Sequence, residues 1–360
     1  PGIRATTGAT IEANGAVAVT TGGDMRSDAI TSDNASTMRL NGPLNLGVTG
    51  TQAATLKISS TATITYAGVA DLRNSGLNGS GIRAVTGGVA TATASSNTSI
   101  QSSGINGIGI SVRDAGSQVN LAGAATIRVT GATQANTPAG TQESFAAGLL
   151  VTGGGALNAA GSLAIATTDA SSYGAALLAN NPSISATGTG SITAAGSALG
   201  FFAGTGQTAS FDGFAITSAA GDLVRVNAAT GATLALKNSS AMASSTGNLL
   251  HAVNGGSLIF TADNSTLTGN VVTDATSTVD MRLSNGSALT GSIDPVALTI
   301  DGTSRWTMTG SSSLSSLALA GRIDFQPTGT GFVPQTLTVN GNWVGQGGVV
   351  AMRTALGDSA

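Results

Sequence analysis

The sequence predicts an all-β fold: a right-handed, single-stranded parallel β-helix with three short strands in each coil. Small side chains dominate the composition, because Gly alone supplies 52 of 360 residues, while aromatic residues make up 3% and charged residues 9%. Short apolar pairs recur along the chain, and Asn residues recur where strand-like runs end. Recurrence at a spacing of about 20 to 50 residues is the signature of a solenoid.

The composition indicates a folded chain with a narrow core. An ordinary globular domain carries about 25% charged residues, and a disordered chain is usually rich in charge and proline. Here charged residues are 9% and only 7 residues are Pro, whereas apolar residues reach 41%. Because bulky aromatic fillers are scarce, we expect a thin core built from Val, Ile, Leu and Ala.

Strand-like runs of about four to seven residues are cut by Gly, Asn and Ser. Examples are residues 126–129, 257–260 and 278–283. No stretch sustains the i, i+3, i+4 apolar spacing of an amphipathic helix. The elements are therefore expected to be short strands joined by turns.

Apolar pairs, or single apolar residues at the same phase, mark the repeat. Most spacings from Leu149 onward are 22–28 residues, which suits a coil of three strands and three turns. Stacked strands lie about 4.8 Å apart, so roughly fifteen coils would give a rod about 70 Å long. The markers are Ile82, Ile110, Leu149-Leu150, Leu177-Leu178, Phe201-Phe202, Leu223-Val224, Leu249-Leu250, Val271-Val272 and Ile293.

A second marker confirms the phase of the repeat. Asn238, Asn264 and Asn285 each follow a strand-like run and are each followed within two residues by Ser. Asn tolerates the left-handed backbone that a tight corner demands. The Asn-x-Ser/Thr triplets also match glycosylation acceptors, but their recurrence at one point of the repeat favours turn chemistry.

One segment interrupts the repeat. Residues 131–144 are polar, contain Pro and lie in the long interval between Ile110 and Leu149. We interpret them as a loop projecting from the rod, because loops on rigid scaffolds often carry recognition. A tolerated surface insertion is the alternative. The candidate binding residues of this loop are Gln134, Asn136, Thr137, Gln142 and Glu143.

The composition of the sequence changes near the C-terminal end. Trp306, Phe325, Phe332 and Trp343 cluster there, and they include both Trp residues of the chain. A solenoid needs a cap, because its last coil leaves backbone groups unpaired and the core open. We therefore divide the chain into a β-helix stem, residues 1–304, and a capping module, residues 305–360.

Residues 304–325, 337–345 and 354–359 carry a specific resemblance. They resemble the pertactin-like C-terminal module of autotransporter (type V secretion) passenger domains. The resemblance implies a bacterial virulence factor on the outer-membrane surface or secreted. It also implies that the module is an autochaperone, with Trp306, Phe325 and Trp343 as its structural residues. A precursor would continue into its own C-terminal β-barrel, a partner that this sequence lacks.

The composition also limits which partners, metal sites and catalytic groups are expected. The net charge is −3, and the 12 Arg are spread singly without interleaved aromatic residues, so no nucleic-acid partner is expected. There is no Cys, and the single His is His251, so neither zinc spacing nor a Ser-His-Asp triad is expected. We predict that the protein is not an enzyme and needs neither metal nor cofactor.

Three carboxylates have the spacing of the repeat. Asp280, Asp301 and Asp324 are 21 and 23 residues apart, so they are expected to stack on adjacent coils. Two neighbouring carboxylates can divide acid and base roles in glycoside hydrolysis. We favour a solvated or ion-paired ladder instead. The basic residues available to pair with them are Arg282, Arg305 and Arg322.

Three functional classes remain open on the sequence. The first is a binding passenger, an adhesin or immune-evasion factor that captures a host extracellular or serum protein such as a complement or contact-system regulator. The second is a self-associating passenger that mediates aggregation or biofilm formation. The third is a carbohydrate-active enzyme. The scarcity of catalytic residue types and the long lateral surface favour the first.

Overall fold

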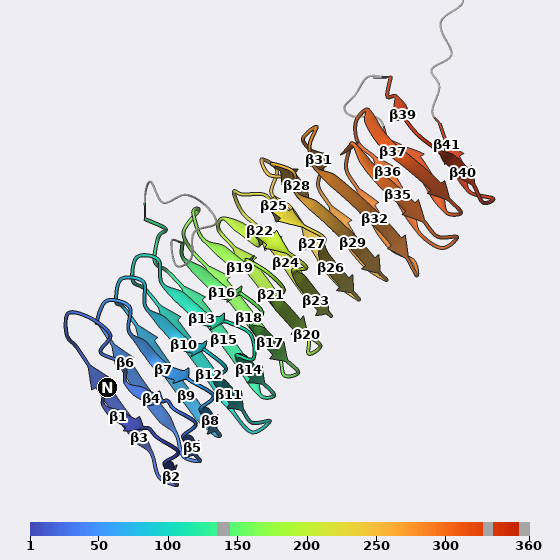
Figure 1. Ribbon diagram of the computed structural model, residues 1–360. Helices are drawn as coiled ribbons and strands as arrows, with labels where there is room; N and C mark the ends of the chain where they lie inside the picture. The colour runs from blue at the N-terminus through green and yellow to red at the C-terminus, as the bar shows by residue number, and fades with distance from the viewer. Residues whose placement is uncertain (135–144, 327–333, 353–360) are drawn as a thin grey trace, which may run out of the picture.

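The computed structural model describes residues 1–134, 145–326 and 334–352. These residues form 41 strands and no helix. The strands wind into a right-handed parallel β-helix of about 13 coils, with three strands in each coil. Figure 1 shows the coils stacked along one axis from the blue N-terminal end to the red C-terminal end. The predicted fold class is confirmed, with somewhat fewer coils than the roughly fifteen expected.

Each coil adds one strand to each of three sheets, which we call A, B and C. Within the described residues these sheets contain 12, 15 and 14 strands. Sheet A contains β1 (Ile3–Ala5), β4 (Ile30–Ser32), β7 (Ala54–Ser59), β10 (Ser80–Val85), β13 (Ile108–Arg113), β16 (Ala147–Thr152), β19 (Tyr173–Leu178), β22 (Ser197–Thr205), β25 (Val224–Thr230), β28 (Leu250–Val253), β31 (Val271–Thr273) and β34 (Ile293–Asp294).

Sheets B and C follow A in each coil. Sheet B contains β2 (Thr10–Ala13), β5 (Thr37–Leu40), β8 (Thr63–Tyr66), β11 (Val89–Ala92), β14 (Gln118–Leu121), β17 (Ala156–Ala159), β20 (Ser183–Ala186), β23 (Thr208–Asp212), β26 (Ala232–Lys237), β29 (Ser257–Asp263), β32 (Thr278–Ser284), β35 (Val296–Ile300), β37 (Ser312–Leu319), β39 (Leu337–Val339) and β40 (Trp343–Gly345). Sheet C contains β3 (Val17–Thr21), β6 (Leu44–Val48), β9 (Val69–Asn74), β12 (Asn97–Ser102), β15 (Ala124–Val129), β18 (Leu163–Thr167), β21 (Gly190–Ala194), β24 (Phe214–Ser218), β27 (Ser240–Met242), β30 (Thr266–Thr268), β33 (Ala288–Thr290), β36 (Arg305–Met308), β38 (Arg322–Phe325) and β41 (Val349–Ala351).

The apolar markers of the repeat fall on sheet A. Ile82 pairs with Ile110, and Ile110 pairs with Leu149, 39 residues further along the chain. This long interval confirms an insertion between two coils. Leu149 then pairs with Ala175 rather than with Leu177. The spacing of the apolar markers therefore overestimates the length of that coil by two residues. A shift of two residues keeps side chains on the same face of a strand.

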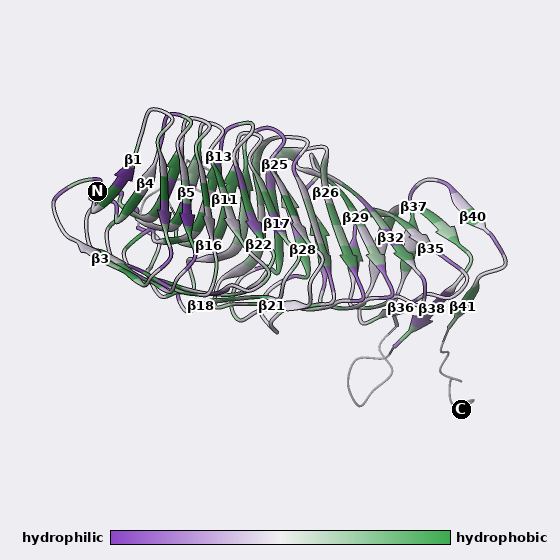
Figure 2. Ribbon diagram, turned by 90° about the horizontal axis from the view of Figure 1, so that it is seen from below, coloured by the Kyte–Doolittle hydropathy of each residue, from purple (hydrophilic) through white to green (hydrophobic). Residues whose placement is uncertain are grey.

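The core is a narrow column inside the tube. Along most strands of sheets B and C side chains alternate, so that those facing inward are buried and those facing outward are half-buried or exposed, as in β14. Ala, Val, Leu and Ile supply most of the buried side chains, and the few large aromatic ones include Tyr66, Phe201 and Phe260. Figure 2 shows hydrophobic residues concentrated along the strands and more polar ones in the turns. The expected thin, aromatic-poor core is confirmed.

The Asn corners lie between sheets B and C. Asn238, Asn264 and Asn285 have φ angles of 48°, 47° and 57°, the left-handed conformation that the sequence indicated. Side-chain hydrogen bonds also link neighbouring coils at these corners: Asn264 Nδ2 donates to Asn238 Oδ1 at 2.7 Å, and Asn285 Nδ2 donates to Asp263 Oδ1 at 3.0 Å. Turn chemistry therefore accounts for their recurrence.

A ladder of buried Ser residues runs beside the Asn corners. The backbone N–H of Ser239 donates to Ser265 Oγ at 3.1 Å, and that of Ser265 donates to Ser287 Oγ at 3.0 Å. The backbone N–H of Ser287 donates in turn to Ser304 Oγ at 3.1 Å. Each hydroxyl thus satisfies a buried backbone donor of the preceding coil, which would otherwise be costly.

The C-terminal coils differ from the rest. Sheet A ends at β34 among the described strands, whereas sheets B and C continue to β40 and β41. Beyond β34 the backbone N–H of Ile293 donates to Ser312 Oγ at 3.1 Å, so a side chain takes the place of the next strand. The last described coils therefore have two sheets instead of three.

Candidate binding surfaces

The insertion between β15 and β16 has a closed base. Thr133 Oγ1 accepts from the backbone N–H of Ala146 at 3.1 Å, so the two ends of the insertion meet. The same hydroxyl donates to the backbone carbonyl of Ser171 at 2.8 Å, on the next coil. The backbone N–H of Gln134 donates to Asn106 Oδ1 at 2.7 Å. The base of the loop is therefore tied to the coils on both sides.

The candidate binding residues divide into two groups. Gln134 lies at the base of the insertion and is exposed. The other four lie outside the described residues. They are Asn136, Thr137, Gln142 and Glu143.

A second apolar cluster lies on the outer face of sheet A, where the chain returns from the insertion at Phe145. The rings of Phe145, Tyr173 and Phe202 pack together, with centroids 5.2–5.6 Å apart. Successive side chains of a strand point to opposite faces. Leu149 and Val151 belong to the inner core, so Leu150, which lies between them and belongs to this cluster, points outward from the tube. The remaining members are Ile108, Ala147, Ala176 and Leu178.

The sequence analysis did not find this outer cluster. The signal was present, since β16 is apolar or buried at every position and so does not alternate. A continuous apolar strand has both faces covered. The register of neighbouring coils was needed to see that the covered outer positions lie side by side.

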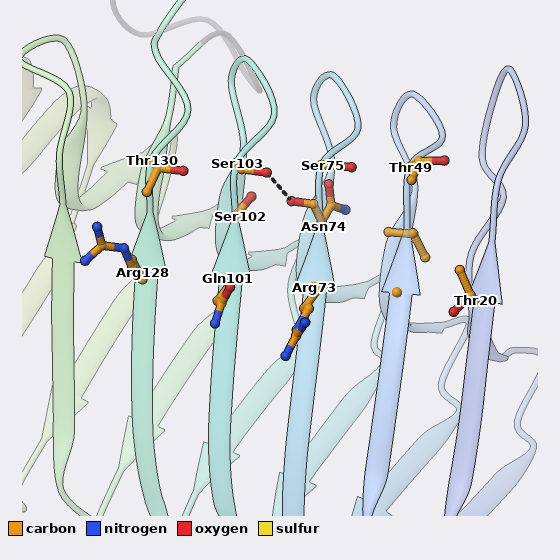
Figure 3. A pocket seen from close by; sticks show the side chains of 12 residues that line it. Thr20, Thr49, Arg73, Asn74, Ser75, Gln101, Ser102, Ser103, Arg128 and Thr130 are labelled. Atoms are coloured by element: carbon orange, nitrogen blue, oxygen red, sulfur yellow. Dashed lines mark hydrogen bonds between the residues drawn. The ribbon is translucent and has the colours of Figure 1, made fainter.

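A shallow groove of about 330 Å³ runs across the outer face of sheet C. Figure 3 shows Arg73, Gln101 and Arg128 projecting from three successive strands, with a row of hydroxyl side chains above them. Strand register places the three in one column, and Gly47 continues it on the preceding coil. Arg73 is ion-paired with Asp71, with 2.6 Å between Nη2 and Oδ2. The groove therefore presents stacked polar groups at the strand spacing.

The predicted carboxylate ladder is wrong. Asp280 lies on β32 of sheet B, Asp324 lies on β38 of sheet C, and Asp301 lies at the corner after β35. The similar sequence spacings gave a wrong prediction because the coils are shorter here. Asp301 accepts from the backbone N–H of Asn285, which is only 16 residues before it on the preceding coil. The carboxylates do not share a face, so the reason for considering a paired acid and base disappears.

Ion pairing of two of these carboxylates is confirmed. Asp280 lies 2.7 Å from Arg282, and Asp324 lies 2.7 Å from Arg322, each pair on a single strand. Such exposed pairs contribute at most about 1 kcal/mol. They are surface features of the sheets.

His251 lies on β28 and takes part in a polar cluster on sheet A. Its Nδ1 is 2.9 Å from Asp222 Oδ2, and Arg225 Nη1 is 3.1 Å from the same oxygen. Asn248 donates to Asp222 Oδ1 through Nδ2 at 2.9 Å. Burial alone would raise the pKa of Asp222, but the hydrogen bonds from Asn248 and His251 outweigh it and hold that pKa below its usual value.

The three aromatic residues assigned to the cap occupy different positions. Trp306 on β36 is fully buried, and its Nε1 donates to the carbonyl of Gly291 at 2.9 Å. Phe325 on β38 is partly buried against the core. Trp343 on β40 is 53% exposed, although it pairs in register with the buried Leu317. Trp306 is therefore the main packing residue of this region, whereas Trp343 is exposed on β40.

The fold defines the chain as a β-solenoid protein. The sequence matches no protein-family model, and a search of curated proteins finds no matching relative. In residues 1–134, 145–326 and 334–352, no group of three or more His, Cys, Asp or Glu could hold a metal ion. Nor do these segments contain a helix with the length and apolarity needed to cross a membrane.

Proposed function

We propose that this β-solenoid is an autotransporter passenger that binds a host extracellular or serum protein at the bacterial cell surface or after secretion, as an adhesin or immune-evasion factor. The C-terminal resemblance supports the class of protein. The lateral surface of the rod supports binding, because it is long, polar and built on a rigid parallel scaffold.

The observation that carries the proposal is that both ends of the insertion are fixed to the rod. The strands on either side of it keep their register, since β13 pairs with β16 and β15 pairs with β18 without a bulge. Phe145 fixes the C-terminal end of the insertion in a buried aromatic cluster. Thr133 links the two ends of the insertion through its hydrogen bond with the backbone of Ala146. A tolerated insertion needs no such anchoring, whereas a recognition loop gains affinity from a fixed base.

Replacing residues 135–144 by a short Gly-Ser link tests the proposal. The link can close, because the backbone N–H of Ala146 already lies 3.1 Å from Thr133 Oγ1. We expect the shortened rod to keep its circular dichroism spectrum and thermal midpoint. We expect it to lose binding to host cells and to immobilised serum and matrix proteins, measured by surface plasmon resonance.

Arg282→Gln provides a matched surface control, because Arg282 lies on sheet B and pairs only with the neighbouring Asp280 in its described contacts. This variant should bind like the wild type. Equal binding by the shortened rod and the wild type would remove the insertion as the recognition element.

Self-association is the second candidate function, and the groove on sheet C favours it. Thr49, Ser75, Ser103 and Thr130 line it from successive coils, and so repeat similar hydroxyl groups along the rod. Two rods lying side by side gain many equivalent hydrogen bonds from such a column. Sedimentation at rising concentration distinguishes this function, since it alone requires dimers.

A further inference from the structure

The charged side chains of sheet C gather at the groove on its outer face. Among the described strands of this sheet from β3 to β33, only Asp71, Arg73 and Arg128 are charged. Both Arg residues line the groove, and Asp71 lies two residues before Arg73 on β9. The fold therefore concentrates charge at one place on a face that is otherwise neutral.

The groove is elongated along the axis of the rod. Its lining residues come from β3, β6, β9, β12 and β15 and from the turns that follow some of these strands. At about 4.8 Å per strand, five strands extend it over about 19 Å. Gly47 lies between Thr20 and Arg73 in the strand register. Because Gly47 has no side chain, the column is open at that coil.

Two of the lining side chains are available to a ligand. Within the residues that the structure describes, neither Gln101 nor Arg128 makes a side-chain hydrogen bond or ion pair, and both side chains are exposed. They are neighbours in the register of β12 and β15. Arg128 thus offers the five N–H donors of its guanidinium, and Gln101 offers an amide donor and an acceptor beside it.

Arg73 is partly engaged. Its Nε and Nη2 donate to the two carboxylate oxygens of Asp71 at 3.1 and 2.6 Å. This pair is neutral overall, and Nη1 of Arg73 takes part in neither bond. The charge of Arg128 therefore stays uncompensated among the charged groups of these strands, and the groove favours an anionic ligand.

The charge and the strand spacing together select the kind of ligand. A carboxylate matches the planar fork of a single guanidinium. In an extended peptide, side chains on one face recur about every 6.6 Å, out of step with strands about 4.8 Å apart. A linear polysaccharide advances by close to one strand spacing with each sugar ring, so successive sugars meet successive coils. A second copy of the groove would instead bring two uncompensated Arg128 side chains together.

We propose that this groove binds a linear polysaccharide that contains uronic acids, lying along the rod axis. A sugar carboxylate pairs with Arg128, while hydroxyl groups of neighbouring sugars form hydrogen bonds with Gln101 and with Nη1 of Arg73. The row of Thr and Ser hydroxyls beside them (Figure 3) contacts the edge of the sugar chain. This binding goes beyond the proposed capture of a host protein, and it uses only residues that precede the insertion in the chain.

Isothermal titration of the whole chain tests the proposal with three probes: a mannuronic acid tetrasaccharide, its methyl ester and tetraglutamate. We expect saturable binding of the acid tetrasaccharide, and binding of the ester and the peptide that is about tenfold weaker or less. Arg128→Gln should weaken binding of the acid tetrasaccharide by about tenfold, because it removes a charge-assisted contact. Gln101→Glu should weaken it similarly, because the new carboxylate repels the ligand.

Arg39→Gln is the matched control. Arg39 is exposed on β5 of sheet B and, like Arg128, makes no side-chain hydrogen bond or ion pair within the described segments. This variant should bind the acid tetrasaccharide like the wild type. Since Arg39, Gln101 and Arg128 are all exposed, each variant should keep the circular dichroism spectrum of the wild type.

The proposal is overturned if the acid tetrasaccharide does not saturate the wild type, or if its methyl ester or tetraglutamate binds equally well. Equal affinities of Arg128→Gln and Arg39→Gln for the acid tetrasaccharide also overturn it. Sedimentation provides the remaining outcome. A wild-type dimer that Arg128→Gln dissociates and that excess tetrasaccharide leaves intact would assign the groove to self-association instead.

Discussion

Single hydroxyl and amide groups determine how the corners of this rod are built. The Asn corners could be predicted from sequence, because the preference of Asn for a left-handed backbone is local chemistry. The Ser ladder could not, because each hydroxyl matters only through a backbone N–H of the preceding coil. The same limit applies to Lys57 and Arg83, which are neighbours only because β7 and β10 pair in register.

The Ser ladder gives a prediction about stability. Ser265 is buried and accepts from the backbone N–H of Ser239 at 3.1 Å. Ser265→Ala leaves that donor buried without its acceptor, which should cost about 1–3 kcal/mol. The urea-unfolding midpoint measures the loss. Ser240→Ala is the control, because Ser240 is exposed, and equal midpoints for the two variants would contradict the ladder's role.

The Asp222 cluster gives a prediction about pH. The pKa of Asp222 is lower in the fold than its ordinary value of 3.8. Its carboxylate therefore stabilises the fold fully above about pH 4, and this contribution is lost as the pH falls through the lowered pKa. The gap in free energy of unfolding between wild type and Asp222→Asn should be largest at pH 7. It should narrow below pH 4, and a constant gap would contradict the assignment.

At the scale of elements, the sequence predicted short strands and turns correctly, because their apolar spacing and turn residues are periodic. It did not predict that β16, β19 and β22 carry apolar side chains on both faces. A continuous apolar run does not say which of its residues point inward. Nor did it predict the loss of sheet A after β34, since the shortened coils keep similar composition.

The C-terminal coils give a prediction about folding order. If this module folds first, its buried aromatic residue should be packed in the transition state. Trp306→Leu should then slow refolding, whereas Phe260→Leu should mainly speed unfolding. Both side chains are fully buried, so both variants should lose about 1–3 kcal/mol of stability. Stopped-flow kinetics measures the rates, and equal refolding rates would show that the module does not seed the fold.

At the scale of the whole molecule, a long and narrow core fixes a rod whose lateral faces are available over its full length. The fold class was predictable because most coils repeat the same physical solution: small inward side chains, polar outward ones and a left-handed corner. The recognition that we propose is different in kind. It depends on a feature that occurs once, the insertion between β15 and β16, and a repeat pattern does not contain it.

The most direct test of the account is a pull-down from human serum and matrix extract with the whole rod immobilised at its C-terminal end. Binding by the lateral surface predicts saturable capture of a defined host protein, which excess soluble rod displaces and which the rod shortened at 135–144 no longer captures. Retention of soluble rod alone, with concentration-dependent dimers in sedimentation and no host protein bound, would contradict it.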